Sequence, residues 1–155
     1  MIRLFTLALL LATSPAHADV FKKLKRATEA RQTHTLTKML KHDRSVVRQR
    51  AAAGLAKCPF LEVRKISADP LIRCLENANE RDFVRAACGK TLALVDEKRA
   101  VSGIISAIND ARGDARFSLV EALAMFRTPE ARATLNELKG DIDPFVSSAA
   151  QGAKQ

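Results

Sequence analysis

Apolar residues recur along the chain at the spacing of one helical face, and the spacing itself repeats. Four stretches each begin with an apolar anchor residue, and these anchors are Val47, Val84, Ala115 and Val146. In the first three stretches, apolar residues follow four, eight and eleven positions beyond the anchor, so they form one stripe on a helix of about 3.6 residues per turn. The stripe residues are Ala51, Leu55 and Cys58, then Cys88, Leu92 and Val95, then Leu119, Leu123 and Phe126. Successive anchors lie 37, 31 and 31 residues apart, a period that predicts stacked helical units.

A second apolar helix pattern precedes each stripe, so the predicted unit is a helical hairpin. These patterns are "TLTKMLKH", "DPLIRCLENA", "AVSGIISAIND" and "TPEARATLNEL". Asp69, Thr128 and Asp143 each stand before a proline, which is typical of an N-cap followed by proline at the first helical position. The sequence therefore predicts helices that begin at these three prolines. The apolar segment 59–68 is then expected to be a long connection that packs against the stack.

The second helix of the first unit carries a family signature. The stretch "DRSVVRQRAAAGL" resembles the second helix of a HEAT-like repeat, and it is similar to the short subtype associated with phycobilisome lyases. The stretch "VRAACGKTL" repeats that signature in the second unit. The resemblance implies an all-α fold, a right-handed α-solenoid of about four HEAT-like helical hairpins. The implied repeats cover approximately residues 28–58, 69–95, 97–126 and 128–155.

The first eighteen residues have the pattern of a secretory leader. "MIR" is a short basic start, "LFTLALLLAT" is an apolar run, and Ala16-His17-Ala18 places small residues around the expected cut. A mature transmembrane helix needs about 20 apolar residues, so the run is short for an anchor that stays in the membrane. We therefore expect residues 1–18 to be a cleaved signal peptide, residues 19–155 to form one repeat domain, and the protein to be periplasmic or secreted. An uncleaved anchor helix is the alternative.

The mature chain would contain three cysteines in an oxidising compartment, so one internal disulfide can form. We predict a bridge between Cys58 and Cys74, because Cys58 ends the first stripe close to where the next hairpin is expected to begin. A bridge between Cys74 and Cys88 is the rival, since both lie in one antiparallel helix pair. The absence of any bridge is the third alternative.

Positive charge is concentrated near the start of the predicted domain. Residues 19–50 contain ten Lys and Arg against three Asp and Glu, whereas residues 51–155 contain fifteen against fourteen. The leading basic residues are Lys22, Lys23, Lys25 and Arg26. This end is either a solvated, solubilising surface or an electrostatic binding site for an anionic partner.

Three arginines occupy equivalent positions in successive units. Arg48, Arg85 and Arg116 each follow an anchor by one residue, so we expect them to form a ladder. The HEAT-like resemblance implies that this arginine ties a repeat to an acidic residue in a neighbouring turn. The candidate acids are Asp43, Asp82 and Asp114. The alternative is that the ladder forms a basic groove that binds an acidic ligand.

The sequence offers little that would support catalysis. It contains no G-x-S-x-G, no phosphate-binding G-x-x-x-x-G-K-[ST] and no H-E-x-x-H, and His34 and His42 lack companions at metal-ligand spacing. The leader disfavours a phycobilin lyase, and the absence of Trp and Tyr disfavours a HEAT-like DNA glycosylase. We therefore expect a non-enzymatic protein with no metal, no small-molecule cofactor and no intracellular nucleic acid as partner.

Two function classes remain from the sequence. The first is a scaffold that binds a protein partner on the long concave surface that stacked repeats present. The second is a binder of polyanions such as lipopolysaccharide, anionic lipid, cell-wall polymer or extracellular nucleic acid, through the basic N-terminal end and the arginine ladder.

Overall fold

The computed structural model describes residues 15–153, and in this range the chain folds into nine α-helices and one short 3-10 helix, with no strand. The helices are α1 (Pro15–Glu29), α2 (Thr33–Met39), α3 (Ser45–Leu55), α4 (Phe60–Glu76), α5 (Asp82–Leu94), η1 (Lys98–Ala100), α6 (Val101–Asp110), α7 (Gly113–Leu123), α8 (Pro129–Leu138) and α9 (Pro144–Gly152). The predicted all-α fold is confirmed.

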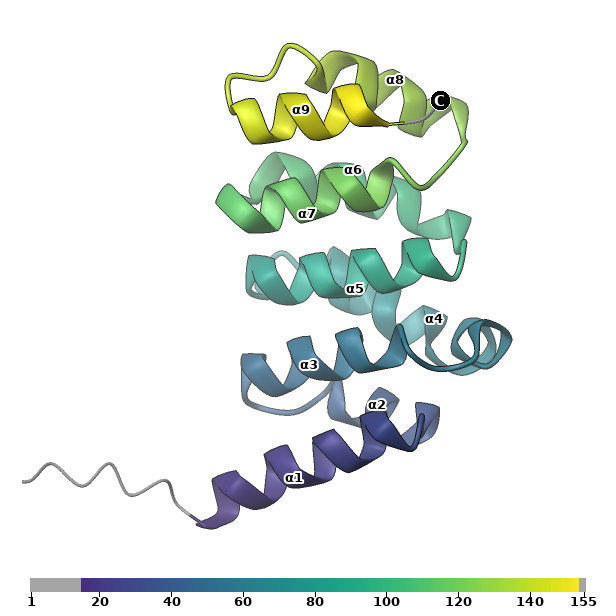
Figure 1. The fold of residues 1–155 in the computed structure, drawn as a ribbon, viewed down its shortest axis with the longest axis vertical. Helices are drawn as coiled ribbons and strands as arrows, with labels where there is room; N and C mark the ends of the chain where they lie inside the picture. The colour runs from purple at the N-terminus through teal and green to yellow at the C-terminus, as the bar shows by residue number, and fades with distance from the viewer. Residues whose placement is uncertain (1–14, 154–155) are drawn as a thin grey trace, which may run out of the picture.

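The helices form two layers, as Figure 1 shows. The even-numbered helices α2, α4, α6 and α8 lie behind, and α3, α5, α7 and α9 lie in front, each packed on the next along the stack. Four hairpins therefore stack one on another in chain order, which is the architecture of a helical repeat solenoid. The added helix α1 packs against α2 and α3 at the N-terminal end of the stack.

The core follows the stripes that the sequence predicts. The anchors Val47, Val84 and Val146 are fully buried, and Ala115 is partly buried against the same core. The stripe residues four, eight and eleven positions beyond the first three anchors are also buried, and they belong to one continuous apolar cluster. A single short hairpin cannot cover its own apolar face, so neighbouring hairpins supply the cover and the stack is stabilised unit by unit.

Helix α4 begins earlier than the sequence analysis predicts. It runs without interruption from Phe60 to Glu76, so Pro70 lies inside the helix and the predicted connection over residues 59–68 is wrong. The reason is an apolar stripe that continues upstream, because Val63 and Leu71 are both fully buried on the same face. Proline lacks the N–H that would bond one turn back, and the burial of this longer face offsets that loss. The other two predicted caps form, since Thr128 and Asp143 accept hydrogen bonds from backbone N–H groups of α8 and α9.

The disulfide joins Cys74 to Cys88, so the predicted Cys58–Cys74 bridge is wrong. The error follows from the helix start. Because α4 begins at Phe60, Cys74 lies fourteen residues along it, roughly 21 Å from its first turn and from the chain near Cys58. Cys88 lies on the antiparallel partner helix α5, and the two Cα atoms are 6.3 Å apart. Cys58 remains an unbridged, buried residue.

The predicted leader lies almost wholly outside the described residues, which begin at Pro15. The expected cut after Ala18 falls within α1, and a helix from Asp19 onward would remain after cleavage. The sequence analysis missed α1 as a helix, although Leu24 and Ala27 lie on one helical face and are both buried. In the described part of the chain, no helix is long and apolar enough to cross a membrane.

Candidate functional site

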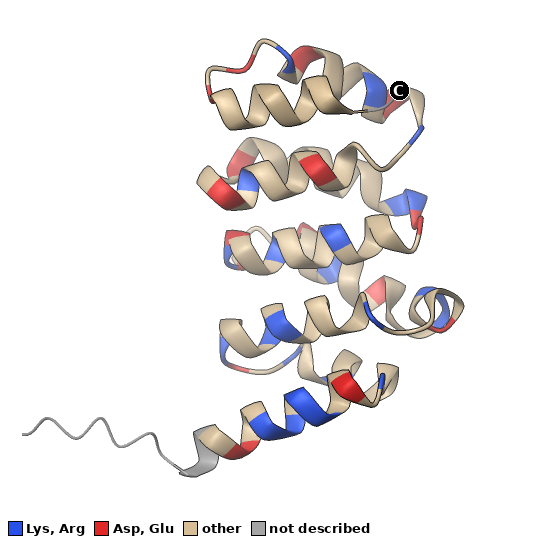
Figure 2. Ribbon diagram, viewed as in Figure 1, with Lys and Arg blue, Asp and Glu red and all other residues tan. Residues whose placement is uncertain are grey.

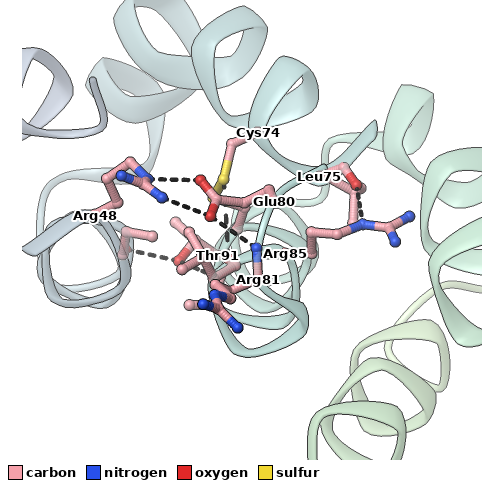
Figure 3. The surroundings of a disulfide bond; sticks show 11 residues. Arg48, Cys74, Leu75, Glu80, Arg81, Arg85 and Thr91 are labelled. Atoms are coloured by element: carbon pink, nitrogen blue, oxygen red, sulfur yellow. Dashed lines mark hydrogen bonds and ion pairs between the residues drawn. A yellow bond between two sulfur atoms is a disulfide. The ribbon is translucent and has the colours of Figure 1, made fainter. Parts of the chain in front are cut away.

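Each ladder arginine joins two successive hairpins. Arg48 donates from Nε and Nη2 to the two carboxylate oxygens of Glu80, at 2.6 and 2.7 Å. Its Nη1 also donates to the carbonyl oxygens of His42 and Asp43, at 2.6 and 2.8 Å. Figure 3 shows the paired bonds between Arg48 and Glu80. The guanidinium therefore binds the turn of its own hairpin and the turn of the next hairpin together.

The same arrangement recurs one and two units further on. Arg85 donates from Nε to the carbonyl oxygen of Leu75 at 2.8 Å, as Figure 3 shows, and Nη1 lies 3.2 Å from Oδ2 of Asp110. Arg116 donates from Nε to the carbonyl oxygen of Ile108 at 3.2 Å, and its two terminal nitrogens bond to Asp141 at 2.8 and 2.6 Å.

The repeated pattern has a clear physical cause. The last carbonyl groups of a helix have no partner within the helix, and a nearby arginine can satisfy them and interact favourably with the helix dipole. Leu75 lies in the last turn of α4 and Ile108 in the last turn of α6. Arg85 and Arg116 therefore cap the first helix of their own hairpin, whereas Arg48 binds carbonyl groups of the turn that follows α2. All three pair with an acid from the next hairpin.

The predicted acids of the ladder are wrong. Asp43, Asp82 and Asp114 do not pair with the arginines through their side chains. The acids that do so are Glu80, Asp110 and Asp141. Each lies four or five residues before the anchor of the following unit, in the turn that the structure places beside the arginine.

Two of the ladder acids, Glu80 and Asp141, are held in their charged form. Burial is the largest single influence on Glu80 and favours its neutral form, but hydrogen bonds from Arg48 and from the backbone N–H of Arg81, with their charges, outweigh it and lower the pKa below the ordinary 4.5. The hydrogen bond from Arg116 is the main cause of the lowered pKa of Asp141, whose ordinary value is 3.8. In turn, Glu80 and Asp141 raise the pKa of Arg48 and Arg116.

A shallow groove crosses the front helices α3, α5 and α7. It encloses about 410 Å³. Its small and apolar lining residues include Ala53, Ala56, Phe83, Ala87, Leu94 and Ala115. Phe83 is 38% exposed there, although it is a large aromatic side chain. Lys90, which lines the groove, forms an exposed ion pair with Glu121 at 3.4 Å.

Basic residues are concentrated at the N-terminal end of this front face. Figure 2 shows Lys and Arg gathered on α1 and α3, whereas α7 carries acidic residues as well as an arginine. The four basic residues predicted at the N-terminal end all lie exposed on α1. Lys22 and Lys25 line a cleft between α1 and α3, and Lys22, Lys23 and Arg26 line a second depression beside α2.

A model of HEAT repeats matches residues 68–153, which is more than half of the chain. The chain belongs to the HEAT-repeat family. Proteins built from HEAT repeats commonly mediate protein–protein interactions. None of the curated proteins matches the chain.

The HEAT stack separates the predicted site residues into two groups. The ladder arginines lie in the first turns of α3, α5 and α7, and their guanidinium groups bond to the carbonyl and carboxylate groups described above. Arg85 is only 3% exposed. The basic residues of α1 are exposed at the end of the stack. Two of them, Lys22 and Lys25, line one cleft together with Arg50 of α3 and Lys57, which follows α3. Arg50, Lys57 and Phe83 were not predicted as site residues. Each is exposed and directly precedes an anchor or stripe residue in the sequence, which is the signal that could have found them.

Among residues 15–153, no group of three or more His, Cys, Asp and Glu side chains is placed to hold a metal ion.

Proposed function

We propose that this HEAT-repeat protein is a non-enzymatic, exported scaffold that binds a protein partner in the groove across α3, α5 and α7. The observation that carries the proposal is the apolar lining of that groove, with the exposed ring of Phe83 at its edge. Exposed aromatic side chains beside small residues suit a partner side chain that is buried on binding.

The arginine ladder supports the groove by holding its helices in register. Arg48 links the first hairpin to the second, and Arg116 links the third to the fourth. Thr91 adds a buried hydrogen bond from α5 to the carbonyl oxygen of Ala52 on α3, at 2.8 Å. A surface held in this way loses little conformational freedom on binding, which favours affinity.

The disulfide supports the export of the protein from the cytosol. Disulfides form and persist mainly outside the cytosol, and the structure contains one within the second hairpin. Together with the leader pattern, this favours a periplasmic or secreted protein over a cytosolic one.

Capture of a partner from cell-envelope extract tests the function. Ala87→Arg places a long charged side chain in the middle of the groove, and Ala133→Arg makes the same change on the exposed face of α8. We expect a partner that is captured by the unmodified protein and by Ala133→Arg, and lost with Ala87→Arg at an unchanged melting temperature. A partner that is retained by Ala87→Arg would contradict binding in the groove.

A second candidate function is the binding of an anionic partner by the basic end. The cluster of Lys22, Lys25, Arg50 and Lys57 at one cleft favours it. The ladder arginines add little to this candidate because their guanidinium groups already bond to carbonyl and carboxylate groups of the protein. Anion binding should weaken steeply as salt rises, whereas an apolar protein interface should not.

A further inference from the structure

The cleft between α1 and α3 combines an apolar floor with a basic rim. It encloses about 630 Å³, within the range of about 300–1,000 Å³ that is typical of small-molecule sites. Leu24, Ala53 and Gly54 contribute to the floor, and the ring of Phe21 forms part of one wall. Gly54 allows this close approach, since a Cβ there would lie 2.8 Å from Oγ1 of Thr28.

Cations surround this cleft in excess over acids. The basic lining residues are Lys22, Lys25, Arg50 and Lys57, whereas Glu29 is the acidic one. Glu29 lies 3.8 Å from Lys25, in an ion pair whose side chains are both largely exposed. Within the described residues, no carboxylate lies within ion-pair distance of Arg50, Lys22 or Lys57. The rim therefore carries a net positive charge that the protein itself does not neutralise.

The aromatic wall orients two of the nearby cations. The guanidinium carbons of Arg44 and Arg50 lie 5.2 and 5.0 Å from the centre of the Phe21 ring. A guanidinium that rests on a ring through cation–π attraction keeps its N–H groups directed outward in its own plane. Those groups can bind a phosphate or carboxylate through paired hydrogen bonds.

We propose that the α1–α3 cleft binds an anionic amphiphile with a single acyl chain. The chain lies along the floor formed by Leu24 and Ala53, and the anionic head group binds at Arg50 and the lysines of the rim. A hydrophilic polyanion would leave the apolar floor in water, so an amphiphile fits the cleft better than a polymer. This inference rests on the second candidate function, which it makes specific, and it is independent of protein binding in the groove.

Titration with defined amphiphiles tests the inference on the exported protein as purified. Lysophosphatidic acid, below its critical micelle concentration, is expected to bind saturably with one ligand per chain. Affinity should rise about fourfold for each added methylene that the cleft can bury. Lysophosphatidylcholine, which has a zwitterionic head group without net charge, should bind at least about tenfold more weakly. Inorganic phosphate, which has no chain, should not compete at equal concentration.

Matched variants locate the site. Arg50→Gln removes an exposed rim charge and should weaken lysophosphatidic acid binding about tenfold or more. Arg132→Gln makes the same change on the exposed face of α8 and should have no effect. Equal binding by both variants would overturn the inference, because the ligand would then bind elsewhere.

Inorganic polyphosphate separates failure of the inference from failure of the candidate function on which it rests. Salt-sensitive polyphosphate binding without lysophosphatidic acid binding would overturn the amphiphile site and leave anion binding by the basic end intact. If neither probe binds, both are refuted.

Discussion

Replacing Arg85 by alanine tests whether the ladder acts mainly as a helix cap or mainly as an ion pair. The Arg85 side chain is 3% exposed and donates to the carbonyl oxygen of Leu75 at the end of α4, at 2.8 Å. Its acidic partner Asp110 is 3.2 Å away, and the Asp110 side chain is 54% exposed. The two contacts thus differ sharply in their access to water.

The expected loss of stability follows from this difference. Leaving a buried carbonyl without its hydrogen bond costs about 1–3 kcal/mol, and the lost packing of the buried arginine stem adds to that. An ion pair with a half-exposed partner contributes only about 0–1 kcal/mol. We therefore expect Arg85→Ala to lower the free energy of unfolding by about 2–4 kcal/mol, and Asp110→Asn to lower it by less than about 1 kcal/mol.

Urea unfolding of the oxidised protein measures both values, provided that the dependence on urea concentration has the same slope in all variants. Arg85→Met keeps the apolar stem and removes the donors, so it should recover only the packing part of the loss. The capping explanation would be refuted if Asp110→Asn destabilised the protein as much as Arg85→Ala. If Arg85→Ala left the free energy of unfolding unchanged, the ladder would have no structural role at Arg85.

Three further predictions concern other parts of the stack. Folding lowers the pKa values of Glu80 and Asp141, so their contribution to stability is fully present above about pH 4.5 and is lost as the pH falls through the folded values. Unfolding measured as a function of pH should show this loss of stability in acid. The double variant Glu80→Gln with Asp141→Asn should have a shallower loss. Tryptic mapping without reduction should find peptide 74–81 linked to peptide 86–90, and reduction should lower stability by about 3 kcal/mol. Arg31 has a φ of 50° at the end of α1, so Arg31→Gly should raise stability by about 0.5–1 kcal/mol in thermal unfolding.

Each of these predictions has its own contrary result. An acid transition that is unchanged in the double variant would show that other carboxylates dominate. A linked peptide that contains residues 58–64 would contradict the bridge. For the glycine substitution, Arg127→Gly is the control, because the backbone at this turn residue is not left-handed. If both variants lost stability equally, the entropy cost of glycine would outweigh the relief of strain at Arg31.

The hairpin architecture could be predicted from sequence because a stripe such as the one from Val47 depends only on helical geometry and burial. The start of α4 could not be predicted in this way. The preference of proline for the first position of a helix is a local rule, whereas the stripe upstream of Pro70 depends on packing against the rest of the stack. The disulfide error followed directly, because the position of Cys74 relative to Cys58 depends on where that helix begins. The acid partner of Arg116 required knowing which turn of the next unit lies beside it. The cleft required knowing that α1 packs beside α3 at all.

The bridge between Cys74 and Cys88 lies within one hairpin, whereas the arginine links join one hairpin to the next. Under tension applied along the chain, these two kinds of link respond differently. The ionic and hydrogen-bonded links between hairpins can open and re-form, so the stack can lengthen reversibly by separating its units. The covalent bridge withholds the intervening residues from extension and shortens the fully stretched chain by roughly 40 Å. The bridged segment 74–88 is therefore inextensible, whereas the rest of the second hairpin is not, and reduction would release that length.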